Sequence, residues 1–167
     1  LFDDAFLIAG IETIIGGTGR DTVDMASNLL YTPTTNADII TVDVSAGAGY
    51  TLVSTTHNFA YAKVIGSSTN KGTVILDGAN LFDADFVNMY QGNIGTLTMR
   101  DQTPVIVTLA EMAVASGLDQ LQLGGGADLV NVTDFAEALT VRGAAGNDIV
   151  TTSFAALSSL TFIGGDD

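Results

Sequence analysis

The residues of this chain that could bind a metal ion are aspartates that follow short runs of glycine. In the clearest case, residues 16–24 read G-G-x-G-x-D-x-U-x, in which U is a large apolar residue. Glycine permits tight turns with positive φ and leaves room for main-chain carbonyls to converge on an ion. The carboxylate of Asp21 is a hard oxygen ligand of the kind that Ca²⁺ prefers. The stretch therefore indicates a calcium-binding loop that leads into a strand.

A degraded copy of this loop occurs at residues 33–41, where Asn36 replaces the last glycine and Asp38 takes the aspartate position. Asparagine also tolerates positive φ. Asp38 follows Asp21 at close to the ~18-residue spacing of two nonapeptides, so the two carboxylates could stack on one edge of the fold. Because Gly, Asn and Asp are common in ordinary tight turns, a turn without calcium is the alternative reading at Asp38.

The loops become regularly spaced in the last third of the chain. Loops at 124–128, 143–148 and 164–166 each follow a short apolar segment and end at Asp128, Asp148 and Asp166. They recur about every 20 residues, which is the sequence signature of a solenoid, a fold of stacked repeats. Each repeat has one glycine–aspartate corner and one apolar corner, so we expect neighbouring loops to stack.

Strands must carry these loops, and the rest of the chain is rich in strand-forming residues. Valine, isoleucine and threonine dominate residues 39–65, 72–78 and 95–99, and glycines separate the runs. We expect residues 1–41 to start a calcium-loop solenoid and residues 117–167 to form regular coils that continue past the last residue. Residues 42–116 are expected to be a degenerate solenoid or β-rich segment without clear calcium loops. The predicted fold class is all-β.

The composition of the chain narrows its possible partners. Five basic and 19 acidic residues give a net charge of −14, which repels nucleic acids and anionic membranes and favours divalent cations. Cysteine is absent, which excludes disulfides and thiolate metal sites. No apolar run approaches the ~20 residues that cross a bilayer, so we expect no membrane span. The chain begins at Leu1 and ends within a loop, so we expect an excerpt of a longer polypeptide.

Residues 10–24 and the loops after residue 117 resemble the RTX family, the calcium-binding nonapeptide proteins that bacteria export by type I secretion. The Gly-Ile-Glu-Thr-Ile segment ahead of the first loop is similar to degenerate RTX segments of Gram-negative surface-layer proteins and large adhesins. The resemblance implies a right-handed parallel β-solenoid (a β-roll or β-helix) with coils of about 20 residues. It also implies unfolded export and calcium-triggered folding outside the cell.

The same resemblance implies a set of calcium ligands. The carboxylates of Asp21, Asp128 and Asp148 would bind the ion, and main-chain carbonyls of neighbouring loop residues would complete each site. The chain departs from the family pattern at Arg20, which puts a positive charge in the first loop, and at Ala144 and Ala145, where alanine replaces glycine-tolerant positions. The candidate metal-binding residues are Gly16, Gly17, Gly19, Asp21, Asp38, Gly124, Gly125, Gly126, Asp128, Gly143, Ala145, Asn147, Asp148, Gly164, Gly165 and Asp166.

These features favour a calcium-dependent structural or assembly module of an extracellular bacterial surface protein, such as a surface layer, an adhesin or a matrix protein. We expect the chain to be secreted and to fold when it binds calcium outside the cell, because ligand binding then supplies folding free energy. Its expected partners are calcium ions and either other copies of itself or flanking domains of a larger chain. Solenoid ends expose strand edges, which fits such end-to-end assembly.

The alternative is a β-helical lyase or epimerase that acts on acidic polysaccharides. Such an enzyme needs a base and a group that neutralises the uronate carboxylate. The candidates for these roles are His57, Lys63, Arg100 and the pair Asp83 and Asp85. A chain of net charge −14 repels uronates, and no convergent acid–base constellation is visible, so we do not expect an enzyme.

Overall fold

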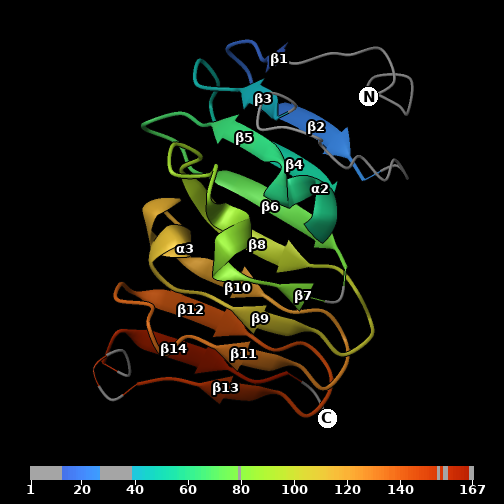
Figure 1. Ribbon diagram of the computed structural model, residues 1–167, viewed down its shortest axis with the longest axis vertical. Helices are drawn as coiled ribbons and strands as arrows, with labels where there is room; N and C mark the ends of the chain where they lie inside the picture. The colour runs from blue at the N-terminus through green and yellow to red at the C-terminus, as the bar shows by residue number, and fades with distance from the viewer. Residues whose placement is uncertain (1–12, 27–38, 79, 154, 156–157, 166–167) are drawn as a thin grey trace.

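The strands of this protein run parallel to one another and stack along one axis (Figure 1). The structure, a computed structural model, describes residues 13–26, 39–78, 80–153, 155 and 158–165. Asp38 and Asp166 lie outside these described residues. The strands are β1 (Thr13–Ile15), β2 (Asp21–Met25), β3 (Ile40–Asp43), β4 (Tyr50–Thr55), β5 (Ala62–Ile65), β6 (Gly72–Asp77), β7 (Asn80–Leu81), β8 (Ile94–Met99), β9 (Ile106–Thr108), β10 (Gln120–Gln122), β11 (Leu129–Asn131), β12 (Leu139–Arg142), β13 (Ile149–Thr151) and β14 (Leu160–Ile163).

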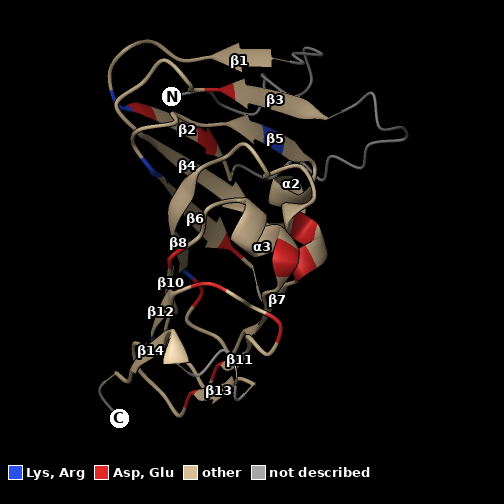
Figure 2. Cartoon of the chain, turned by 90° about the vertical axis from the view of Figure 1, so that its left-hand side faces the viewer, with Lys and Arg blue, Asp and Glu red and all other residues tan. Residues whose placement is uncertain are grey.

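The described strands form three parallel sheets. The largest has seven strands in the order β14-β12-β10-β8-β6-β4-β2, and it spans the whole length of the stack. The two smaller sheets, β1-β3-β5 and β13-β11-β9-β7, face it in the first and second halves of the chain, as Figure 2 shows from the side. We call the chain between one strand of the seven-stranded sheet and the next a pass.

The core lies between the large sheet and the two smaller ones. Strand residues alternate between buried and exposed positions, as in β4 and β6, because successive side chains point to opposite faces. From β2 to β12, one in-register row of the large sheet is apolar throughout, with exposures of 0 to 4 %. It consists of Val23, Leu52, Val74, Leu97, Leu121 and Val141.

The opposite face of the large sheet carries a row of threonines, one per strand with a single exception. These side chains are in register and partly or fully exposed. Such a row buries little apolar surface. Neighbouring threonines on a sheet nevertheless stabilise one another through side-chain contacts. The row consists of Thr22, Thr51, Thr73, Thr96, Gln120, Thr140 and Thr161.

Three short helical segments lie in the middle of the chain: α2 (Thr56–Ala60), the 3₁₀ helix η2 (Asp83–Phe86) and α3 (Glu111–Ala115). The hydroxyl oxygen of Thr55 accepts a hydrogen bond from the Asn58 amide and so caps the start of α2. The fully buried Phe59 of α2 packs edge-to-face on Phe86 of η2, with ring centres 5.2 Å apart. Helices α2 and η2 are therefore anchored in the core through aromatic side chains, whereas the buried residue of α3 is Ala113.

The predicted fold class, an all-β right-handed parallel β-solenoid with coils of about 20 residues, is wrong. The described strands belong to three separate parallel sheets of three, seven and four strands, and α2, η2 and α3 lie between strands. The chain is a mixed parallel fold that is mostly strand and has few helices. The physical reason lies in the middle of the chain, where the connections are longer than in the last third. Residues such as Phe59 and Phe86 bury themselves there in helical turns.

Within the described residues, no helix is long and apolar enough to cross a membrane.

Candidate metal centre in the glycine–aspartate loops

The loops in the second half of the chain stack directly on one another. Loop 124–128 lies between loop 101–105 of the preceding pass and loop 143–148 of the next. The Gly126 amide donates to the Ala145 carbonyl at 2.8 Å, and Gly125 and Ala145 form a parallel bridge. A Cβ on Gly124 would collide with the Asp101 carbonyl below it, so close stacking requires glycine there.

The aspartates of these loops bond from one pass to the next. Oδ1 of Asp128 accepts the Val105 amide at 2.9 Å, and Oδ1 of Asp148 accepts the Asp128 amide at 3.0 Å. We call Val105, Asp128 and Asp148 the aspartate ladder. Each carboxylate in it satisfies a backbone N–H of the pass before it, as buried N–H groups require.

The second oxygen of Asp128 has no such partner. The residue is 1 % exposed, and its Oδ2 is buried without a hydrogen bond. Burial raises the pKa of Asp128, the Val105 amide partly offsets this, and the negative charges of Asp148 and Asp101 raise it further. The neighbouring Asp101 has a lowered pKa because the backbone amide and hydroxyl of Thr103 donate to it. The loops therefore gather negative charge around a buried carboxylate whose second oxygen has no hydrogen-bond partner among the described residues.

The first loop contains a second buried, unpartnered carboxylate oxygen, Oδ2 of Asp21. This oxygen faces Gly47 in the next pass. A Cβ built on Gly47 would lie 2.8 Å from the Gly19 carbonyl oxygen and 3.3 Å from both Asp21 Oδ2 and the Val44 carbonyl oxygen. Three oxygens therefore converge on this side of Gly47, although the Gly19 and Val44 carbonyls also accept the Ala48 and Gly47 amides. Oxygen atoms of this kind are the ligands of a hard cation such as Ca²⁺.

A cavity of about 300 Å³ borders the last described loop. Its walls come from residues 146–149 and from Phe162, Gly164 and Gly165. Oδ2 of Asp148 lies against Gly143, where a Cβ would collide with it. The cavity thus lies between two successive glycine loops, which is where an ion shared by neighbouring passes would sit.

The structure brings only part of the predicted set together. Loops 124–128 and 143–148 are adjacent, whereas loop 16–21 lies near the opposite end of the large sheet. The two kinds of loop also connect the large and small sheets in opposite directions along the chain. Loop 16–20 leads from a small sheet into the large one, and loop 124–128 leads from the large sheet into a small one. Among the described residues, no group of three or more His, Cys, Asp or Glu is placed to hold a metal, so any site depends on main-chain carbonyls.

Two residues of these sites were not among the sequence candidates. Asp101 underlies loop 124–128, and Gly47 completes the space at Asp21. The Asp101–Thr103 pair carries the signal of an Asx turn, in which aspartate bonds to the backbone two residues on. Gly47 stands in a loop without aspartate, and its role depends on the alignment of two passes, which no local pattern reveals.

Three candidates for the alternative enzyme, Asp83, Asp85 and Arg100, make structural hydrogen bonds or ion pairs. Asp83 Oδ1 accepts the amides of Ala110 and Ala113, and its Oδ2 accepts the Met112 amide, so Asp83 caps α3. Arg100 is paired with Asp77 in the adjacent pass. The remaining candidates are on separate elements: His57 on α2, Lys63 on β5 and Asp85 on η2, where Asp85 accepts the Phe82 amide.

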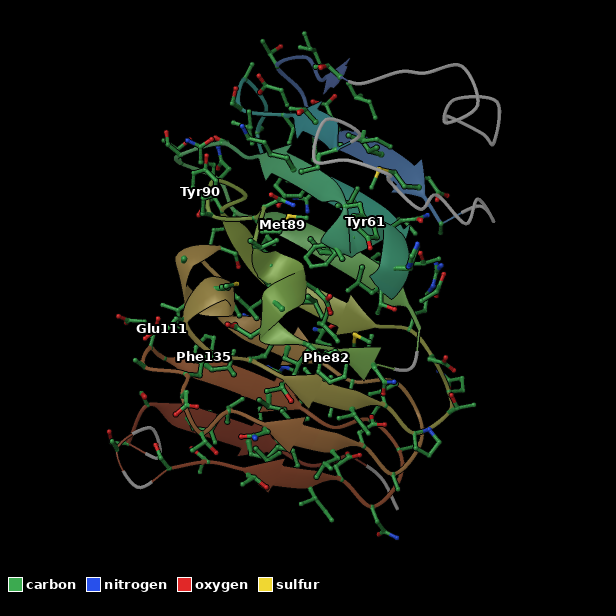
Figure 3. All side chains as sticks on the ribbon, viewed as in Figure 1. Tyr61, Phe82, Met89, Tyr90, Glu111 and Phe135 are labelled. Carbon is green, nitrogen blue, oxygen red and sulfur yellow. The ribbon has the colours of Figure 1, made fainter. Side chains whose placement is uncertain are left out.

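Phe135, labelled in Figure 3, is 2 % exposed and belongs to the apolar core.

No protein-family model matches this chain, and comparisons with curated proteins and with solved structures also gave no match.

Proposed function

We propose that this chain is a calcium-stabilised structural module of an extracellular bacterial surface protein. The observation that carries the proposal is the buried, unpartnered Oδ2 of Asp128, set among the charges of Asp101 and Asp148. An unpaired polar atom that is removed from water costs free energy unless a ligand satisfies it. A divalent cation is the ligand that a chain of net charge −14 attracts most strongly.

Calcium would be held by carboxylate and main-chain oxygens at two places. At the first loop these are Asp21 Oδ2 and the carbonyls of Gly19 and Val44. In the second half they are Asp128 Oδ2 or Asp148 Oδ2 with carbonyls of the stacked loops. When bound, the ion supplies positive charge that cancels carboxylate repulsion between passes, so binding favours the stacked state.

Extracellular calcium modules bind with Kd of about 10⁻⁴–10⁻³ M, which keeps them unloaded in the cytosol. Sites built from one carboxylate and several carbonyls suit this weak range. The absence of cysteine fits a module that is stabilised by ions rather than disulfides. The RTX resemblance of loops 16–24 and 124–148 supports the same assignment to a secreted surface protein.

The far end of the stack supports an assembly role. The β13–β14 end leaves apolar side chains exposed, with Ile149 at 60 %, Phe162 at 42 % and Ile163 at 41 %. Phe162 is in register with the fully buried Val141 of the pass before it, whereas Ile149 and Ile163 are in register with the exposed Leu129 and Arg142. A further strand, from a flanking domain or from another copy of the chain, would therefore cover Phe162.

The decisive experiment compares thermal unfolding in EDTA and in about 10 mM CaCl₂ at constant ionic strength. A site with Kd of ~10⁻⁴ M would stabilise the fold by about 2.7 kcal/mol, or roughly 5–10 °C in Tm. The double variant Asp21→Asn/Asp128→Asn should lose most of this gain. Both substitutions remove a charge but keep an oxygen that accepts hydrogen bonds.

Asp134→Asn is the matched control, because Asp134 is an exposed aspartate outside the loops. This variant should respond to calcium as the wild type does. Equal Tm values for the wild type in EDTA and calcium would refute the proposal, as would an undiminished response in the double variant.

A further inference from the structure

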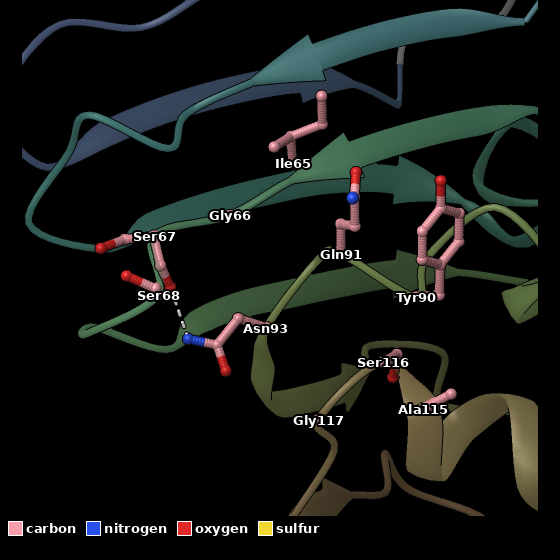
Figure 4. Close-up of a pocket in the computed structure, with 10 residues that line it drawn as sticks. All are labelled: Ile65, Gly66, Ser67, Ser68, Tyr90, Gln91, Asn93, Ala115, Ser116 and Gly117. Atoms are coloured by element: carbon pink, nitrogen blue, oxygen red, sulfur yellow. Dashed lines mark hydrogen bonds between the residues drawn. The ribbon is translucent and has the colours of Figure 1, made fainter.

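A cavity on the side of the molecule opposite the aspartate ladder has no role in the proposed function. Its volume is about 360 Å³, and its walls come from residues 65–68, from residues 90, 91 and 93, and from residues 115–117, which belong to three successive passes (Figure 4). This volume lies at the lower end of the ~300–1,000 Å³ that is typical of small-molecule sites.

Hydrogen bonds between passes hold the walls of this cavity in place. The Gly66 amide donates to the Gln91 carbonyl at 2.9 Å, and Asn93 Nδ2 donates to the Ser67 carbonyl at 2.5 Å. The Ile94 amide donates to the Ser116 carbonyl at 2.8 Å. A Cβ on Gly66 would collide with the Gly92 carbonyl, so the backbone at Gly66 packs closely against the backbone at Gly92. The cavity is therefore pre-formed, which lowers the entropic cost of binding a ligand.

Several polar side chains of the cavity have no partner within the described part of the chain. Tyr90 is 56 % exposed, and it projects beside Gln91 from the same segment (Figure 4). Neither side chain, nor that of the exposed Ser68, makes a hydrogen bond to another described residue. The cavity thus offers a flat aromatic ring, an amide that both donates and accepts, and a hydroxyl.

The lining has no charged side chain. The ammonium group of Lys71 reaches the edge of the cavity, where it bonds to the Gly117 carbonyl at 2.8 Å, but Asp119 already pairs with it at 2.7 Å. Anionic ligands such as uronates or nucleotides would meet no free cation in the lining and a net charge of −14 overall. The ligand that fits is neutral and rich in hydroxyl groups.

We propose that this cavity binds a neutral sugar, with the Tyr90 ring against one face of a pyranose and with the neighbouring Gln91 hydrogen-bonded to its hydroxyls. The amide group matches the mixed donor and acceptor character of a sugar hydroxyl. The aromatic ring covers the apolar C–H face. The proposal does not rest on calcium binding, because neither residue belongs to the glycine–aspartate loops.

The test is a two-dimensional NMR titration of the full chain in calcium with methyl α-glucoside, methyl β-galactoside, methyl α-mannoside and cellobiose. A ligand with so few contacts should bind with Kd of about 1 mM, so about 10 mM sugar should saturate the site. We expect at least one of these sugars to shift the amide signals of residues 66–68 and 91–93. Tyr90→Ala should weaken that binding at least tenfold, and Tyr90→Phe should retain most of it.

Phe82→Ala is the matched control, because Phe82 is also an exposed aromatic residue, at 48 %, but lies outside the cavity. It should bind the sugar as the wild type does. Glucuronate should bind more weakly than the neutral sugars. The proposal is overturned if no neutral sugar shifts these signals, if Tyr90→Ala binds as well as the wild type, or if glucuronate binds best.

Discussion

Asp128 performs two tasks with one side chain. Its Oδ1 satisfies the Val105 amide of the preceding pass, while its Oδ2 is buried with no partner. The first task is structural and does not require a charge, since any acceptor oxygen would serve. The second task places the negative charge of the Asp128 carboxylate near the negative charges of Asp101 and Asp148, which repel it. The two tasks can therefore be separated by substitution.

We predict that the stability difference between the wild type and Asp128→Asn depends on pH in the absence of calcium. Burial raises the pKa of Asp128 in the folded state, so the folded chain binds this proton more tightly than the unfolded chain. Below the unfolded pKa, near 4, the residue is neutral in both states and carries no penalty. As the pH rises through the raised folded pKa, the wild type should lose stability relative to Asp128→Asn.

Urea unfolding midpoints in EDTA, measured for both proteins from about pH 4 to pH 7, test this expectation. Asp128→Ala provides the contrast, because it leaves the Val105 amide unpaired and should cost about 1–3 kcal/mol at every pH. A difference between the wild type and Asp128→Asn that stays constant over this range would show that the buried charge does not destabilise the fold.

At the level of elements, only a few positions in the glycine–aspartate loops require glycine for the backbone conformation. Gly126 and Gly146 have φ values of +127° and +112°, a region that other residues rarely adopt. A Cβ on Gly146 would also collide with the Gly126 carbonyl of the pass below. By contrast, Gly17 and Gly19 face open space, so a side chain there meets no atom within 4 Å.

Gly146→Ala should therefore destabilise the protein by about 1–3 kcal/mol through backbone strain and loss of loop stacking. Gly19→Ala should be neutral or stabilise by up to about 1 kcal/mol, since alanine restricts the unfolded chain. Chemical denaturation of the two variants, under the same calcium conditions, gives the comparison. Similar losses in both would mean that conformation at residue 146 is not the limiting factor.

Local sequence patterns predicted some of these elements and missed others for identifiable reasons. Runs of valine, isoleucine and threonine marked β3, β4 and β6, because alternation on a strand is a local property. Helix α2 was missed because Phe59 is held by Phe86, a residue far along the chain. The threonine row was missed for the same reason, since Thr22, Thr51 and Thr73 become neighbours only when the passes are in register.

The candidate site was predictable to the extent that it is local. The glycine–aspartate spacing indicated Asp21, Asp128 and Asp148 as residues of special loops, and two of these have buried, unpartnered oxygens. The ladder to Val105 and the oxygens around Gly47 depend on which loop stacks on which. That arrangement follows from three-sheet topology, which the regular spacing after residue 117 does not determine.

At the scale of the whole molecule, the excess of acidic groups opposes folding. In Figure 2, the red segments that mark Asp and Glu occur along both halves of the chain and the blue ones that mark Lys and Arg are few, in keeping with the net charge of −14. Such self-repulsion weakens as salt screens it, with a Debye length of about 10 Å at 0.1 M. The increase in stability from charge screening should therefore be separable from the increase that specific calcium binding gives.

We predict that NaCl raises Tm in EDTA through screening, and that calcium adds a further increase at constant ionic strength. Magnesium should be less effective, because it requires near-octahedral geometry and gives up its water reluctantly. Thermal melts in NaCl, MgCl₂ and CaCl₂ at matched ionic strength measure these effects. If magnesium and calcium gave equal shifts, general cation screening would account for the whole response.

The seven-stranded sheet keeps its parallel register although the connections between its strands differ in length and structure. The β4–β6 connection contains α2 and β5, whereas the β10–β12 connection contains only β11. Each strand adds about 4.8 Å to the stack whatever the length of its connection, so seven strands extend roughly 30 Å. The length of the stack is therefore set by the number of strands in the large sheet, and the connecting segments can lengthen or change without altering it.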